Sequence, residues 1–81
     1  MEICRNKATR EVYICLKDAK DMQGYFVSPQ GRVELLNRSG FEAFVEQTDE
    51  MYLRQYMVIT GEQYQTYRKY KEEMIYEVQR N

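Results

Sequence analysis

This 81-residue chain contains no histidine, no tryptophan, one proline and two cysteines. Without histidine it has neither a Ser-His or Cys-His nucleophile pair nor a His-ligated metal site. Two cysteines are also too few for a structural zinc site of the usual cysteine-rich kind. We therefore expect no metal and no cofactor, and we expect that the chain is not an enzyme.

The chain also lacks a large excess of positive or negative charge. Twelve Lys and Arg residues stand against 13 Asp and Glu residues, which gives a net charge of −1. This balance argues against binding that depends on attraction of the whole molecule to phosphates. With 43% hydrophobic and 31% charged residues, the composition is typical of a folded domain with a well-solvated surface. A chain of this length has room for one core, so we expect a single domain over residues 1–81.

Long apolar runs are absent too. The longest unbroken run extends from Val12 to Leu16, far short of the roughly 20 residues that span a bilayer. The N-terminal residues lack the apolar segment of a secretory signal, and we expect a soluble, cytoplasmic protein. Cys4 and Cys15 fit that compartment as free thiols, with one disulfide between adjacent strands as the alternative.

Alternating apolar residues predict strands in the first half of the chain. In residues 10–17 the apolar side chains of Val12, Ile14 and Leu16 share one face, and Tyr13 and Cys15 belong to the other, which we expect to face solvent. Residues 25–27 and 32–36 are two further predicted strands. Pro and Gly in the tetrapeptide between them predict a type I turn. Whether residues 1–5 add another strand stays open.

The second half changes to helical spacing. Residues 39–42 and 60–63 both have the Ser/Thr-x-x-Glu/Gln spacing of a capping box. The first box predicts a short helix that ends near residue 47. The second predicts the longest helix, from 61 to about 79, with a tyrosine-rich apolar stripe. For residues 52–59 a strand is favoured, and an extension of the first helix is the alternative.

Together these elements predict an α+β fold. It consists of a small antiparallel β-meander of three to four strands packed against one or two helices. The long C-terminal amphipathic helix supplies most of the apolar stripe.

Tyrosine and acidic residues are the candidates for partner binding. Eight tyrosines are present; most fit a shallow core, but tyrosine is also enriched at binding hot spots. Tyr76 falls opposite the apolar stripe and is expected to be exposed. Four acids without an intervening base would suit a basic partner. The predicted partner-binding residues are Glu42, Glu46, Asp49, Glu50 and Tyr76.

A basic and aromatic N-terminal sheet face is the alternative binding surface. Sheets that bind single-stranded RNA stack bases on aromatic side chains, while cations hold the backbone. The residues for such a surface are Arg5, Lys7, Arg10, Tyr13 and Arg32. Acidic residues lie between these cations in the sequence, which weakens the pattern.

These observations predict a non-catalytic protein–protein interaction module, such as a small intracellular regulator, adaptor or inhibitor. A nucleic-acid-associated regulator is the alternative. A tyrosine stripe on so small a domain also leaves room for self-association as a homodimer or homo-oligomer.

Overall fold

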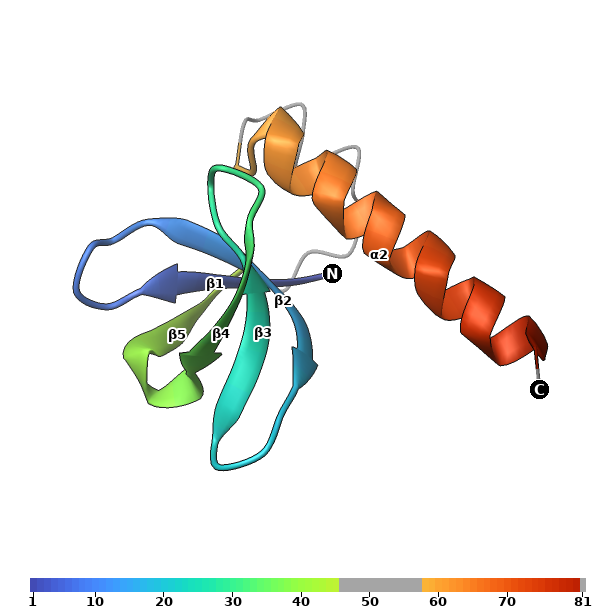
Figure 1. Ribbon diagram of the computed structural model, residues 1–81. Helices are drawn as coiled ribbons and strands as arrows, with labels where there is room; N and C mark the ends of the chain where they lie inside the picture. The colour runs from blue at the N-terminus through green and yellow to red at the C-terminus, as the bar shows by residue number, and fades with distance from the viewer. Residues whose placement is uncertain (46–57, 81) are drawn as a thin grey trace.

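In the computed structural model the chain forms a five-stranded antiparallel sheet with a helix packed against it (Figure 1). The structure describes residues 1–45 and 58–80, with side chains for 1–44 and 58–73. The elements are β1 (Glu2–Asn6), β2 (Val12–Asp18), β3 (Gln23–Val27), β4 (Val33–Asn37), the 3₁₀ turn η1 (Arg38–Gly40), β5 (Phe41–Val45) and α2 (Gly61–Arg80). The α+β class is confirmed, with five strands where the sequence predicted three to four.

The strands lie in the order β4-β3-β2-β1-β5. The predicted meander corresponds to β2, β3 and β4. Strand β1, which the sequence left open, lies near the centre of the sheet, between β2 and β5, with Ile3 opposite Ile14 and Cys4 opposite Tyr13. A terminal segment with few apolar residues is thus held by partners on both sides.

The sheet is strongly rolled. Strands β4 and β5 lie at opposite ends of the strand order, yet only the three residues of η1 connect them. Phe26 of β3 stacks on Phe41 of β5 with ring centroids 4.1 Å apart, although in a flat sheet three strand spacings would separate them by about 14 Å. The rolling brings the two edge strands towards each other and creates an inner face.

Apolar side chains fill both faces of the rolled sheet. The helix-side core consists of Ile3, Ile14, Val27, Ile59 and Tyr67. The inner core consists of Cys4, Tyr13, Cys15 and Phe26, with Leu36 and Phe41 packed against them. The prediction that Tyr13 and Cys15 face solvent is therefore wrong, because rolling encloses the face of β2 that would be open in a flat sheet.

Helix α2 begins at the second predicted capping box, and this prediction is confirmed. The Thr60 Oγ1 accepts a hydrogen bond from Gln63 N at 3.1 Å, and Gln63 Oε1 accepts one from Thr60 N at 2.9 Å. The helix then packs Tyr67 into the helix-side core against β2 and β3. None of the described helices has the length and apolar character that crossing a bilayer requires.

The helix predicted to begin at residue 39 is wrong. Ser39 N donates to the side chain of Asn37 at 2.8 Å in η1, and residues 41–45 form β5 along the edge of β1. These residues form a strand despite the capping-box spacing. As a strand they pack the half-buried Phe41 against the inner core and provide hydrogen-bond partners for the β1 backbone. Residues 46–57 lie outside the described part, and with them most of the segment predicted as strand or helix over 52–59; Val58 and Ile59 form a bend.

Candidate functional site: the open edge of β4

The predicted acidic binding surface is described only at Glu42. Its carboxylate is exposed and forms an ion pair with Arg10, with Oε1 and Nη1 2.8 Å apart. Glu46, Asp49 and Glu50 lie outside the described residues, and Tyr76 lies where side chains are not described. The ion pair joins one predicted partner-binding residue to one predicted nucleic-acid-binding residue, so each neutralises the other.

The aromatic centre of the alternative surface is not accessible. Tyr13 is buried in the inner core, with its ring edge-on to Phe26 and Phe41. Burial raises the pKa of the Tyr13 phenol, and the carboxylates of Glu34 and Glu11 add to this rise. Because its side chain is buried, Tyr13 cannot stack on a base.

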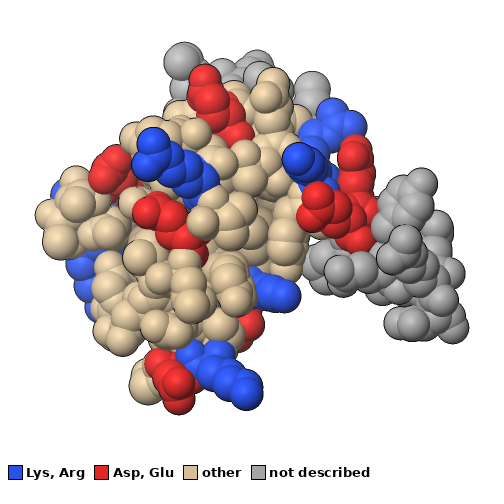
Figure 2. Space-filling view, viewed as in Figure 1, with Lys and Arg blue, Asp and Glu red and all other residues tan. Residues whose placement is uncertain are grey.

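The cations of that surface do not form one patch. Arg5 is half-buried and stacks on Phe44, with its guanidinium carbon 3.8 Å from the ring centroid. Lys7 is exposed in the β1–β2 turn, whereas Arg32 follows the β3–β4 turn. On the face shown in Figure 2, blue and red side chains are interspersed, without a continuous field of one sign.

The two cysteines have a structural role. Both are free thiols, as predicted, and both are buried. Burial raises the pKa of the Cys4 thiol to about 12, with a further contribution from Glu2. The Arg38 guanidinium donates to Cys15 Sγ at 3.2 Å and also pairs with Glu2 and Asp18. A protonated, buried thiol is a poor nucleophile, and the contacts of Arg38 join η1 to β1 and β2.

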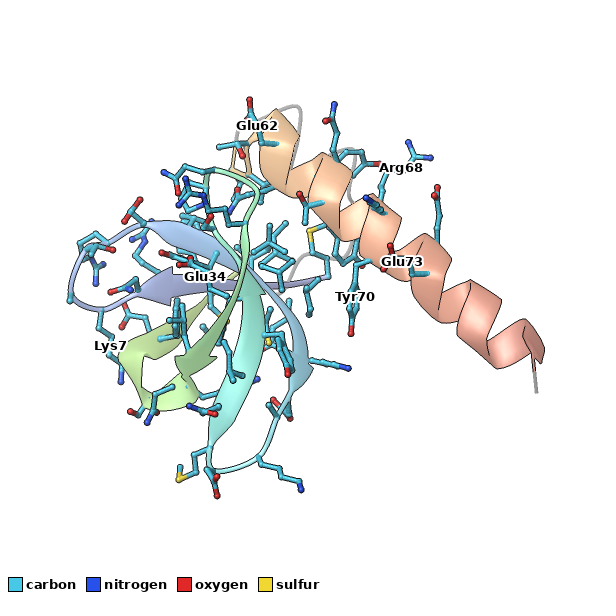
Figure 3. All side chains as sticks on the ribbon, in the orientation of Figure 1. Lys7, Glu34, Glu62, Arg68, Tyr70 and Glu73 are labelled. Atoms are coloured by element: carbon cyan, nitrogen blue, oxygen red, sulfur yellow. The ribbon has the colours of Figure 1, made fainter. Side chains whose placement is uncertain are left out.

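No metal site is found within the part of the chain that the structure describes. Its His, Cys, Asp and Glu side chains form no group of three or more that could hold an ion. The labelled side chains of α2 do not point to one common place. As Figure 3 shows, Glu62 and Arg68 point away from the sheet, whereas Tyr70 points towards it.

The unusual feature is an apolar strip on β4. Val33 is 50% exposed and Leu35 is 46% exposed, and as alternate residues of one strand they lie on the same face. Tyr25 of β3 lies opposite Leu35 in the β3–β4 pair and is half-buried. This face continues the helix-side core, and α2 packs mainly against β2 and β3 and leaves Val33 and Leu35 about half exposed. By alternation the sequence predicts Arg32 and Glu34 on the solvent face of this strand, whereas Glu34 is half-buried and Val33 and Leu35 are exposed.

The backbone of β4 is also available at these positions. Ser28 N donates to Arg32 O, and Arg38 N donates to Met22 O. These two bonds lie at the two ends of the β3–β4 pairing. Because hydrogen-bonded pairs alternate along an antiparallel ladder, Glu34 and Leu36 are the residues of β4 between these ends that bond to β3. The N–H and C=O groups of Val33 and Leu35 must therefore point away from β3. Among the described residues β4 pairs only with β3, so no described strand pairs with these groups, and this unpaired side of β4 is here called its open edge.

The β3–β4 turn is fixed to α2, which holds this edge in place. Thr60 Oγ1 donates to Pro29 O and Thr66 Oγ1 donates to Gly31 O, both at 2.7 Å. Gly31 has a φ of +83°, and a Cβ there would lie 2.9 Å from the carbonyl oxygen of Glu62. Only glycine permits both the turn and this close approach to the helix. The start of the strand is thus held in place by α2.

Comparison with protein-family models, curated proteins and solved structures found no match to this chain. Among the described surfaces, the β4 edge is the one that combines exposed apolar side chains with unpaired backbone groups.

Proposed function

We propose that the chain is a non-catalytic protein-binding module that takes up an extended segment of a partner protein along the open edge of β4. The observation that carries this proposal is the coincidence of exposed apolar side chains and outward backbone groups at Val33 and Leu35. In strand addition, main-chain hydrogen bonds supply affinity and alternate side chains supply specificity.

The sparse protection of this edge is itself informative. Natural proteins usually protect edge strands with charged side chains, Pro or a bulge, because open edges pair with other chains. Strand β4 has no Pro, Lys or bulge between Val33 and Asn37, and Glu34 is its one charged residue. Its anchored turn also lowers the cost of ordering the strand on binding. The proposal places the module in the cytoplasm, where free thiols such as Cys4 and Cys15 persist, as a small regulator, adaptor or inhibitor.

The proposal is tested with the full chain as bait in an extract of its source cells, washed at high salt with nuclease. Proteins captured by the unmodified chain are compared with those captured by Leu35→Lys, which places a charge in the apolar strip. Met22→Lys is the matched control, because Met22 is 75% exposed in the β2–β3 turn and lies outside β4.

We expect at least one protein that Leu35→Lys loses and Met22→Lys retains, and the purified protein should bind with the same dependence. Circular dichroism checks that both variants are folded. If Leu35→Lys removes no protein from the captured set, or if only nucleic acid is recovered before nuclease treatment, the proposal is wrong.

A further inference from the structure

We infer that the partner segment runs antiparallel to β4 and carries the pattern apolar–basic–apolar–acidic. This inference rests on the proposed function and specifies the chemistry of the partner at the same edge. It follows from Arg32, which directly precedes β4, and from the first three residues of β4, Val33, Glu34 and Leu35. It also depends on the lack of an ion pair at Arg32 and Glu34 among the described residues.

Two charged residues alternate with the apolar ones: Arg32 directly precedes β4, and Glu34 lies between Val33 and Leu35. By the alternation of a strand, both belong to the opposite face from Val33 and Leu35. Arg32 is exposed and Glu34 is half-buried, and within the described residues neither forms a salt bridge. Glu34 is labelled in Figure 3, where it lies on β4, well separated from Lys7 and from the outer face of α2. Two opposite charges that form no ion pair with a described residue therefore lie two positions apart along the same edge.

The register of the open edge fixes what lies opposite each residue. In an antiparallel pair, Val33 and Leu35 occupy hydrogen-bonded positions, and Arg32 and Glu34 occupy the alternate positions, where facing side chains are closest. Opposite charges directly across from each other are favourable there, and like charges are unfavourable. A partner strand in the N-to-C direction thus places an apolar residue opposite Leu35, a base opposite Glu34, an apolar residue opposite Val33 and an acid opposite Arg32.

A second copy of β4 does not meet these demands. Self-pairing with Val33 opposite Val33 matches Arg32 with Glu34, but it leaves Leu35 opposite Gly31, whose N–H already donates to Ser28 O. Self-pairing about Leu35 gives more hydrogen-bonded positions, but it places Arg32 opposite Arg38. Pairing Val33 with Leu35 places Glu34 opposite Glu34. Because no self-register satisfies both charges and backbone, the edge fits a different chain.

The test uses two synthetic ten-residue peptides of equal composition. The matched peptide has Val-Lys-Val-Glu at its centre, and the reversed peptide has Val-Glu-Val-Lys. Binding to the ¹⁵N-labelled full chain is followed by NMR at millimolar peptide, since a flexible peptide must be ordered on binding. We expect the matched peptide to bind about tenfold more tightly, with the largest shifts at the amides of Val33 and Leu35. The double variant Arg32→Glu, Glu34→Lys should reverse the preference.

The outcomes separate this inference from the proposed function. If both peptides bind equally and Leu35→Lys abolishes both, strand addition stands and the charge pattern is wrong. If neither peptide binds, the inferred pattern is wrong, whatever the capture experiment shows. If sedimentation shows a dimer of the chain that Leu35→Lys dissociates, the occupant is a second copy and the inference is overturned.

Discussion

Gln63 provides the most demanding test of how α2 is joined to the sheet. Its side chain is 1% exposed, and beyond the capping bond its Nε2 donates to Val12 O at 2.8 Å and to Val27 O at 3.2 Å. Extending the β2–β3 register from the Ile14–Val27 pair places Val12 opposite Pro29, which has no N–H to donate. The Gln63 amide therefore supplies the hydrogen bond that the ladder cannot.

The perturbation is Gln63→Met, which keeps the length of the side chain and its helix propensity but removes its hydrogen bonds. Thr60 N–H and Val12 O lose their partners, and each buried unpaired group costs about 1–3 kcal/mol. Val27 O keeps a second lone pair for the strand ladder, and the buried Met side chain offsets part of the loss. We expect the free energy of unfolding to fall by about 2–4 kcal/mol, which is large beside the roughly 4–12 kcal/mol expected for a chain of this length.

The assay is urea unfolding followed by circular dichroism, with the midpoint and slope fitted for each variant. Gln65→Met is the matched control, since Gln65 is exposed on the same helix two residues later, and it should change stability by less than about 0.5 kcal/mol. If the two variants are equally stable, Gln63 does not join α2 to the sheet and the reasoning is refuted.

Three further predictions follow from individual residues. Gly31→Ala should lower the free energy of unfolding by about 2–3 kcal/mol in the same urea assay, because a Cβ at positive φ meets the Glu62 carbonyl; an unchanged midpoint would contradict the contact. Met22→Gly should raise it by about 0.5–1 kcal/mol, since Met22 has a φ of 60°; a lower midpoint would argue against strain there. The Cys4 thiol has a pKa of about 12 when folded against an ordinary 9.0, so the protonated thiol favours the fold below pH 9. That contribution to the free energy of unfolding should be lost as pH rises from 9 towards 12. In Cys4→Ala the free energy of unfolding should therefore fall less steeply with pH over this range. A pH profile identical to that of the unmodified chain would show that the thiol does not contribute.

Local chemistry made part of this fold predictable. The capping box at Thr60 and the Pro and Gly of the β3–β4 turn act within four residues, and both lie where the sequence predicted. The alternation in β2 likewise predicted a strand at the correct position. These signals depend only on neighbours in the chain, so no knowledge of the rest of the fold was needed.

The remaining features depend on contacts between distant residues. Phe41 joins a strand because Phe26, fifteen positions earlier, receives its ring, and nothing near Ser39 signals that. Rolling of the sheet buried Tyr13, which the alternative nucleic-acid surface required to be exposed. The candidate edge was missed because alternation divides β4 into two faces but does not determine which face other elements cover. Val33 and Leu35 are left about half exposed on the helix side of the sheet.

Amide hydrogen exchange at β4 shows directly whether a partner strand pairs with this edge. In the free chain Glu34 and Leu36, which bond to β3, should exchange slowly, whereas Val33 and Leu35 should exchange fast. With a saturating partner protein or matched peptide, the account predicts that Val33 and Leu35 become protected while the exposed loop amide of Met22 does not. Fast exchange at Val33 and Leu35 in the saturated complex would contradict strand addition at this edge.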